Sequence, residues 1–154
     1  MKTFKITTLQ QTKQLASSLA KQLRVGDIIA LYGNLGVGKT AFTRFLVQSF
    51  CGDGEEVPSP TFTLLQTYDT DYFPIFHFDL YRLKNPNEVF ELGIEDAFYD
   101  GVSLIEWPEK MGSYLPTKKI LKIEIDCKDE VRTFTFSSQN PSWQERLEKW
   151  TETL

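Results

Sequence analysis

Histidine and cysteine, two residue types that often bind metals, are scarce in this chain, with one histidine and two cysteines among 154 residues. Cys51 and Cys127 lie far apart in the sequence and form no C-x-x-C pair. A zinc site is therefore not expected, and no disulfide framework is implied. We interpret both cysteines as free or buried thiols.

Long apolar runs and basic clusters are also missing. No stretch approaches the roughly 18 apolar residues of a membrane-spanning helix, and Lys2-Thr3-Phe4-Lys5 does not resemble a signal peptide. We therefore expect a cytoplasmic protein. Lysine and arginine number 17 against 21 acidic residues, a formal net charge of -4. Nucleic-acid backbones are bound through clustered lysine and arginine, so if the function involves RNA, we expect a partner to carry most of the RNA contact.

The composition is otherwise that of an ordinary globular protein, with 41% hydrophobic and 25% charged residues. A chain of this length buries most of its apolar surface in one core. We therefore expect a single domain over residues 1–154.

The most informative segment is Gly33-Asn34-Leu35-Gly36-Val37-Gly38-Lys39-Thr40, which fits the phosphate-loop pattern G-x-x-x-x-G-K-[ST]. A strand-like run over residues 27–32 precedes it and a helix-like run over residues 41–50 follows, as the motif requires. Glycines let the backbone approach a polyphosphate, and the amides at the start of the helix then point at the anion. The motif predicts that Lys39 binds the β and γ phosphates and that the Thr40 hydroxyl binds Mg²⁺. The predicted nucleotide-binding residues are Gly33, Asn34, Leu35, Gly36, Val37, Gly38, Lys39, Thr40 and Ala41.

The remaining pattern predicts an α/β fold. Strands are expected over residues 2–6, 27–32, 61–68, 74–79, 102–106, 119–126 and 131–137, and helices over residues 9–22, 41–50, from 85 to near 93, and from 140. Strands that alternate with helices favour a three-layer α/β/α sandwich, here of the phosphate-loop NTPase type. Two predicted hairpins make the central sheet mixed, though mainly parallel.

Two acids follow buried-type strands, where ligands collect in open α/β sheets. Asp79 ends the run Ile75 to Phe78, and Glu106 follows Val102 to Ile105. A charge after such apolar residues is costly unless it faces a metal or water. We interpret both as catalytic acids and as candidates for the magnesium shell, without deciding which one binds the metal directly. The alternatives are an ordinary turn acid at a strand end for Asp79 and a salt-bridged structural acid for Glu106.

A third candidate is Thr61, in the proline-stiffened segment Ser59-Pro60-Thr61-Phe62-Thr63. A hydroxyl placed between the loop helix and a strand is typical of a switch threonine that responds to the γ-phosphate. The alternative is a plain turn before the strand.

Other polar and aromatic residues near these motifs remain open between two interpretations. His77 is favoured as a structural histidine over a catalytic one, Trp107 as either core or a platform near the nucleotide, and Arg82 as either a phosphate ligand or a solvated residue. Among the aromatic residues, those expected in the core are Phe42, Phe45, Phe62, Phe76 and Phe78, and those expected as exposed contacts are Tyr72, Phe73, Tyr81 and Tyr99.

Five motifs together resemble the TsaE (formerly YjeE) family of phosphate-loop ATPases from bacterial tRNA threonylcarbamoyladenosine biosynthesis. The motifs are Gly33 to Thr40, Ser59-Pro60-Thr61-Phe62-Thr63, His77-Phe78-Asp79-Leu80-Tyr81-Arg82-Leu83, Leu92-Gly93-Ile94-Glu95-Asp96 and Ile105-Glu106-Trp107-Pro108-Glu109. They occur in the family's order across residues 8–110. One departure is Val37, where the family commonly has alanine.

The resemblance implies a weak Mg²⁺-dependent ATPase that acts with the TsaB and TsaD proteins, the latter modifying adenosine at position 37 of tRNA. It also implies that Lys39 and Thr40 serve phosphate and Mg²⁺, that Thr61 belongs to a switch-like segment, and that Asp79 and Glu106 are the metal-side or catalytic acids.

Three other classes of function were weighed. A GTPase is disfavoured because the chain contains neither N-K-x-D nor D-x-x-G. A small-molecule kinase shares the loop but normally adds an arginine-rich lid, whereas the arginines here are scattered. A nucleotide-gated binding module with little turnover remains the third possibility.

Overall fold

The computed structural model describes residues 1–152 and 154. The strands are β1 (Lys2–Ile6), β2 (Ile28–Tyr32), β3 (Leu65–Tyr68), β4 (Ile75–Asp79), β5 (Val102–Glu106), β6 (Leu121–Lys128) and β7 (Val131–Ser138). The α-helices are α1 (Leu9–Ala20), α2 (Lys39–Cys51), α3 (Ile94–Asp100) and α4 (Pro141–Lys149), and the 3₁₀ helices are η1 (Pro86–Leu92) and η2 (Pro108–Tyr114). Within these residues, every helix is too short or too polar to cross a lipid bilayer.

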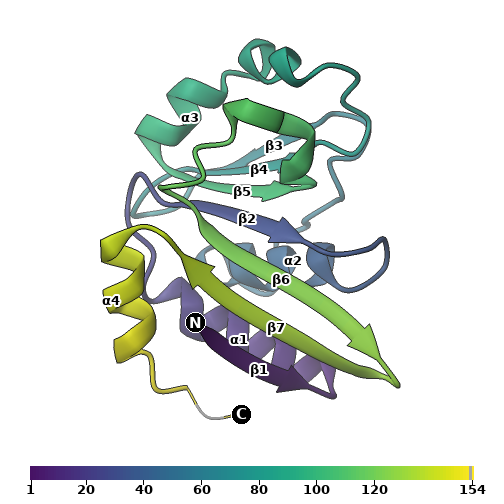
Figure 1. Ribbon diagram of the computed structural model, residues 1–154, viewed down its shortest axis with the longest axis vertical. Coiled ribbons are helices and arrows are strands. Elements are labelled where there is room, and N and C mark those ends of the chain that lie inside the picture. The colour runs from purple at the N-terminus through teal and green to yellow at the C-terminus, as the bar shows by residue number, and fades with distance from the viewer. Residues whose placement is uncertain (153) are drawn as a thin grey trace.

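The strands form one sheet in the order β1-β7-β6-β2-β5-β4-β3 (Figure 1). Its centre is parallel, because β2 pairs with β5 and β6, and β5 pairs with β4, in parallel. The outer pairs, β1 with β7, β7 with β6 and β3 with β4, are antiparallel. The predicted mixed α/β sheet is confirmed, with the two hairpins at its flanks and the parallel strands in the middle.

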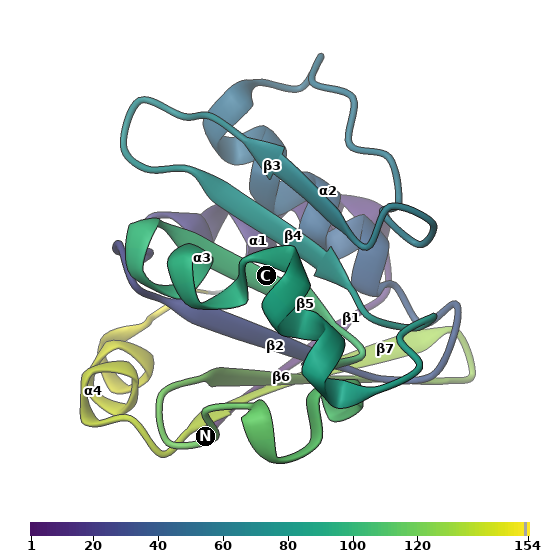
Figure 2. The same cartoon turned by 90° about the horizontal axis from the view of Figure 1, so that it is seen from above.

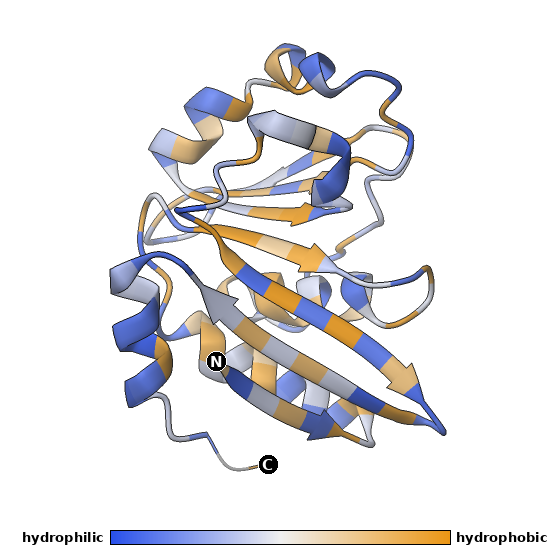
Figure 3. Cartoon of the chain, in the orientation of Figure 1, coloured by the Kyte–Doolittle hydropathy of each residue, from blue (hydrophilic) through white to orange (hydrophobic). Residues whose placement is uncertain are grey.

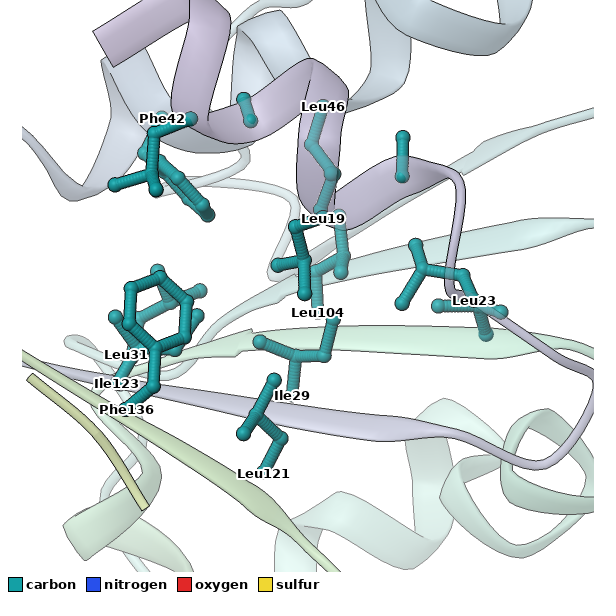
Figure 4. Packing of buried hydrophobic residues seen from close by; sticks show 14 of the residues in the cluster. Leu19, Leu23, Ile29, Leu31, Phe42, Leu46, Leu104, Leu121, Ile123 and Phe136 are labelled. Carbon is teal, nitrogen blue, oxygen red and sulfur yellow. The ribbon is translucent and has the colours of Figure 1, made fainter. Parts of the chain in front are cut away.

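Alternation along the strands builds a hydrophobic core on each face of the sheet. Ile29 and Leu31 of β2 pack with α1 and α2, whereas Ile28 and Ala30 pack with the layer of η1, α3 and η2. Figure 2 shows the two groups of helices on opposite sides of the sheet. In Figure 4, Leu19 and the α2 residues Phe42 and Leu46 lie over the strand residues of the first core.

Hydropathy follows the position of each strand. β2 is buried over almost its whole length and is hydrophobic throughout, whereas β6 alternates between buried and exposed residues (Figure 3). Central parallel strands are covered on both faces, so they lose the alternation that a half-exposed strand keeps. Because the centre of the sheet is buried, the acidic residues that end β4 and β5, Asp79 and Glu106, are buried as well.

The expected strand over residues 61–68 is wrong in its first half. The structure starts β3 at Leu65, and before it the chain turns, with the Leu64 amide donating to the Pro60 carbonyl over 2.6 Å. Leu64 has a positive φ of 67°, which extended backbone does not allow. The turn leaves Phe62 82% exposed, so its predicted place in the core is also wrong.

Two further expectations need correction. Gly93 does end a helical turn, but that turn is 3₁₀, and α3 begins immediately after it with Glu95 and Asp96 in its first turn. These acids suit the positive end of the helix dipole, and the sequence interpretation predicted no helix there. Phe73, expected to be exposed, is buried against Phe50 with ring centroids 5.2 Å apart.

A buried ion pair fastens the C-terminal helix to the edge of the sheet where β2 begins. Arg146 donates from Nη1 to Asp27 Oδ2 over 2.7 Å and from Nη2 to Asp27 Oδ1 over 2.8 Å, and its guanidinium stacks 3.6 Å from the Trp143 ring. Both charged side chains are about nine-tenths buried. Removing one partner of such a pair leaves an uncompensated charge, which costs far more than the pair itself is worth.

We therefore predict that Arg146→Ala lowers the free energy of unfolding by about 3 kcal/mol in a urea titration. The matched control is Lys149→Ala, which removes a cation from the same helix where the partner, Glu145, is exposed. The control is expected to keep the wild-type urea midpoint. An unchanged midpoint for Arg146→Ala would contradict this account of the anchor.

Candidate active site

The predicted phosphate loop connects β2 to α2 and wraps the N-terminus of α2. Gly33 and Gly38 have φ values of 150° and 114°, in the region that favours glycine. A side chain at Gly33 is also excluded by space, since its Cβ would lie 2.7 Å from the Ile125 carbonyl oxygen. Glycine therefore stands in the loop where the backbone conformation or the available space requires it, and Leu35 is exposed at the tip.

Arg132, which is distant in the sequence, is hydrogen-bonded to the backbone of the phosphate loop. Arg132, near the start of β7, donates from Nε to the Val37 carbonyl over 2.8 Å. A Cβ on Gly38 would lie only 3.3 Å from the same nitrogen. The sequence interpretation treated Arg132 as one of several scattered arginines, and no local motif marks it, since it lies 95 residues from Val37.

Lys39 is 4% exposed and makes two contacts within the site. Its Nζ donates to the Gly33 carbonyl over 2.6 Å and sits 3.5 Å from the centre of the Trp107 ring. Burial lowers the pKa of Lys39, while Glu106, Glu109 and Asp79 oppose that shift. Trp107, which the sequence left open, thus lies against the loop lysine and only partly in the core.

The two predicted acids face each other across neighbouring strands. Asp79 on β4 is the register partner of Glu106 on β5, and they are 4% and 2% exposed. Adjacent strands run about 4.8 Å apart, so two buried carboxylates are held close together. Like charges placed directly opposite in a sheet are destabilising unless donors or a cation compensate.

Each oxygen of Glu106 has a partner. Thr40 donates from its hydroxyl to Oε1 over 3.0 Å, and Nε2 of His77 lies 2.5 Å from Oε2. The first contact joins the hydroxyl that the motif assigns to Mg²⁺ with the acid that ends β5. The second involves a histidine for which the sequence favoured a structural role.

Asp79 is held by a different segment. The Thr61 hydroxyl donates to Oδ2 over 2.9 Å, and the Tyr81 amide donates to Oδ1 over 3.1 Å. Ser59 and Thr61 also share a hydrogen bond of 2.7 Å between their hydroxyls. The candidate switch threonine therefore lies in a turn before β3 and contacts one of the two acids, and its response to the γ-phosphate stays a prediction.

The predicted site residues thus converge on one edge of the sheet. Lys39, Thr40, Thr61, Asp79 and Glu106 are brought together, while Asn34, Leu35 and Ala41 lie in or beside the loop without a side-chain hydrogen bond to the acids among the described residues. Arg82 does not join them; its guanidinium lies 4.4 Å from the ring of exposed Phe62.

The donor set suits magnesium held together with phosphate. No group of three or more metal-binding side chains of the histidine, cysteine, aspartate or glutamate type occurs among residues 1–152 and 154. Mg²⁺ usually binds through one or two carboxylates plus phosphate oxygens and water, so two acids and a threonine hydroxyl suffice. Two buried carboxylates beside one buried lysine also leave excess negative charge for a divalent cation to offset.

Comparison with known proteins adds a family to this geometry. The family model described as "Threonylcarbamoyl adenosine biosynthesis protein TsaE" matches residues 6–134. Several proteins that are named tRNA threonylcarbamoyladenosine biosynthesis protein TsaE are similar to this chain. The one from Rickettsia felis is 46% identical over 121 residues, which are 79% of this chain and 70% of that protein.

A second relative of the same name, from Bacillus subtilis, is 33% identical over 130 residues, 84% of this chain and 80% of that protein. Among solved structures, YdiB of Bacillus subtilis superposes with a TM-score of 0.79 at 27% identity and covers 97% of this chain and 93% of its own. The match to the family model spans both the loop and the two strand-end acids. The chain belongs to the TsaE family.

Proposed function

We propose that this protein binds and hydrolyses Mg²⁺-ATP as an accessory component of tRNA threonylcarbamoyladenosine modification, and that it acts with the TsaB and TsaD proteins. The observation that carries the proposal is the 3.0 Å hydrogen bond between Thr40 and Glu106. It joins the last residue of the phosphate loop to a strand-end acid, which is the arrangement that a hydrolysing loop protein needs and a bare anion site does not.

In this proposal the loop amides and Lys39 bind the phosphates, and Thr40 binds the metal with help from Asp79 or Glu106. When bound, magnesium neutralises the charge that develops between the β and γ phosphates. Glu106, whose carboxylate is held on both oxygens, orients the attacking water. Thr61, hydrogen-bonded to Asp79, links the segment after Pro60 to the γ-phosphate.

The proposed role in tRNA modification is supported by the family match, and the net charge supports indirect contact with tRNA. The matching family model and the named relatives are described by threonylcarbamoyladenosine biosynthesis. The net charge of -4 argues that tRNA is met through partners rather than by this chain alone. Adenine is the expected base because N-K-x-D, the motif that reads guanine in GTPases, is absent from the sequence.

The kinase alternative gains no support from the arginines. Arg146 is committed to Asp27, at the edge of the sheet where β2 begins, and Arg132 is committed to the loop backbone. A lid of arginines over the phosphates would need such residues free and close together. A binding module with little turnover differs from the proposal only in rate, so kinetics separate the two.

The proposal predicts that the purified protein releases phosphate from ATP slowly by itself and faster when TsaB and TsaD are added together. A continuous phosphate-release assay with and without the two proteins measures this. Transfer of phosphate to an added metabolite would favour the kinase. Absence of release under every condition would leave only the binding module.

Lys39→Ala is expected to weaken Mg²⁺-ATP binding by about 10–100-fold, the loss of charge-assisted hydrogen bonds to phosphate. Titration calorimetry measures the affinity, and loss of the tRNA modification in cells is the matching phenotype. Lys118→Ala is the control, because Lys118 is exposed just before β6, whose first residues pair with β2 well before the loop. Equal affinities for the two variants would argue against the loop as the phosphate site.

Glu106→Ala is expected to lower the turnover of ATP by about 100-fold or more, while ATP binding changes little. The reason is that Glu106 faces the hydroxyl assigned to the metal and not the loop amides. Glu91→Ala, which removes an exposed acid from η1, should keep both quantities at the wild-type value. Wild-type turnover in the Glu106 variant would remove this residue from the mechanism.

A further inference from the structure

His77, the only histidine in the sequence, is completely buried on β4. Its neighbours Phe76 and Phe78 pack on the opposite face of the sheet, within the core under η1, α3 and η2. Because side chains alternate along a strand, His77 lies on the same face as Asp79 and, across the ladder, Leu104 and Glu106. It is therefore the diagonal neighbour of Glu106, with the 2.5 Å contact between Nε2 and Oε2.

The hydrogen bonding of the ring is concentrated on that one nitrogen. Nδ1 of His77 is buried and has no hydrogen-bond partner in the described part of the chain. A neutral imidazole carries its proton on one nitrogen, and a proton on Nδ1 would leave a buried donor unsatisfied and two acceptors facing each other. The arrangement therefore favours the tautomer in which Nε2–H donates to Glu106.

The Glu106 carboxylate thus has two hydrogen-bond partners of different kinds, one on each oxygen. Thr40, on one side, lies where the phosphate loop enters α2 and is shared with the metal in the function proposed above. His77, on the other side, lies in the middle of β4 and has no second polar contact among the residues described. Only the hydrogen bond between His77 and Glu106 is independent of what the loop binds.

We propose that His77 is a positioning residue that fixes the orientation of the Glu106 carboxylate toward the phosphate loop through its Nε2–H. This inference rests on the proposed ATPase function. It assigns the buried histidine a role in turnover, whereas the sequence pattern favoured a purely structural one. Outer partners that orient a reactive or metal-bound carboxylate are worth about 10–100-fold in activity when removed.

Ser103, a second buried polar residue in the same part of the sheet, serves as a control position for His77. Ser103 on β5 is also fully buried, and its hydroxyl has no partner within the described residues. Its register partner is Phe76, so it lies on the opposite face from His77 and Glu106. Ser103→Ala thus tests the effect of changing a buried polar residue in the same part of the sheet without touching the acid.

Three substitutions separate positioning from packing. The amide nitrogen of glutamine falls near the place of Nε2, so His77→Gln keeps a donor for Glu106. The shorter amide of His77→Asn cannot reach the acid, and His77→Leu fills the space without a donor. Each variant is compared with the wild type and Ser103→Ala for kcat and KM for ATP, with TsaB and TsaD present, at a temperature well below every melting midpoint.

The expected result is that His77→Leu and His77→Asn lower kcat by about 10–100-fold, with KM within about 3-fold of wild type because the loop is intact. His77→Gln should recover most of the loss, and Ser103→Ala should keep the wild-type kcat. A wild-type kcat in His77→Leu, or a glutamine variant no better than asparagine, would overturn the proposal. Should the wild type itself release no phosphate, the proposed function fails first, and the positioning role falls with it.

A second measurement needs no His77 variant to fold. Nitrogen NMR of the wild type labelled in histidine should show the proton on Nε2, and Glu106→Ala should shift that resonance strongly. The single histidine makes the assignment unambiguous. A proton on Nδ1, or a resonance that ignores the Glu106 substitution, would overturn the positioning contact whatever the ATPase assay shows.

Discussion

Two carboxylates held opposite each other at the ends of neighbouring parallel strands are the constraint on which the candidate site depends. Asp79 and Glu106 are in register and almost fully buried. Such a pair is stable only if each charge is met by donors or a cation. The phosphate loop, the segment after Pro60 and the buried histidine each supply one of those donors.

This constraint explains why the donors come from separate parts of the chain. The centre of the sheet is covered on both faces, so the acids at the strand ends there are only 4% and 2% exposed to solvent. Each acid must therefore recruit a partner from the segment packed against it. Glu106 takes Thr40 from the start of α2, and Asp79 takes Thr61 from the turn before β3. The acids in this way couple two segments that a nucleotide is proposed to contact.

The sequence predicted those parts of the site that local patterns encode. The loop is a contiguous motif, and Glu106 and Asp79 follow apolar strand runs that place them at the ligand-binding edge of the sheet. The two hairpins and the parallel centre of the sheet could also be predicted, because turn residues and the alternation of strand-like and helix-like segments indicate them. The 3₁₀ turn with α3 behind it was not readable, because Gly93 serves both as the end of one and the start of the other.

What could not be predicted depends on register and on distant chain segments. The contact between His77 and Glu106 requires β4 and β5 to pair without a slip, and the two residues are 29 apart in the sequence. The brace from Arg132 to the loop joins residues that no local pattern connects. The exposure of Phe62 follows from the positive φ of Leu64, which the residue type itself disfavours.

Lys39 shows how the same burial shapes the binding of phosphate. Its charge is desolvated, which lowers its pKa, and its Nζ is satisfied by the Gly33 carbonyl and the Trp107 ring. A phosphate that engages this lysine must replace those contacts, so binding exchanges interactions and gains only their difference. In the proposed function, the net gain in binding therefore comes mainly from the loop amides. The proposal thus separates two tasks within one site, because the loop supplies the affinity for the nucleotide and Glu106, hydrogen-bonded to Thr40 and His77, acts in turnover.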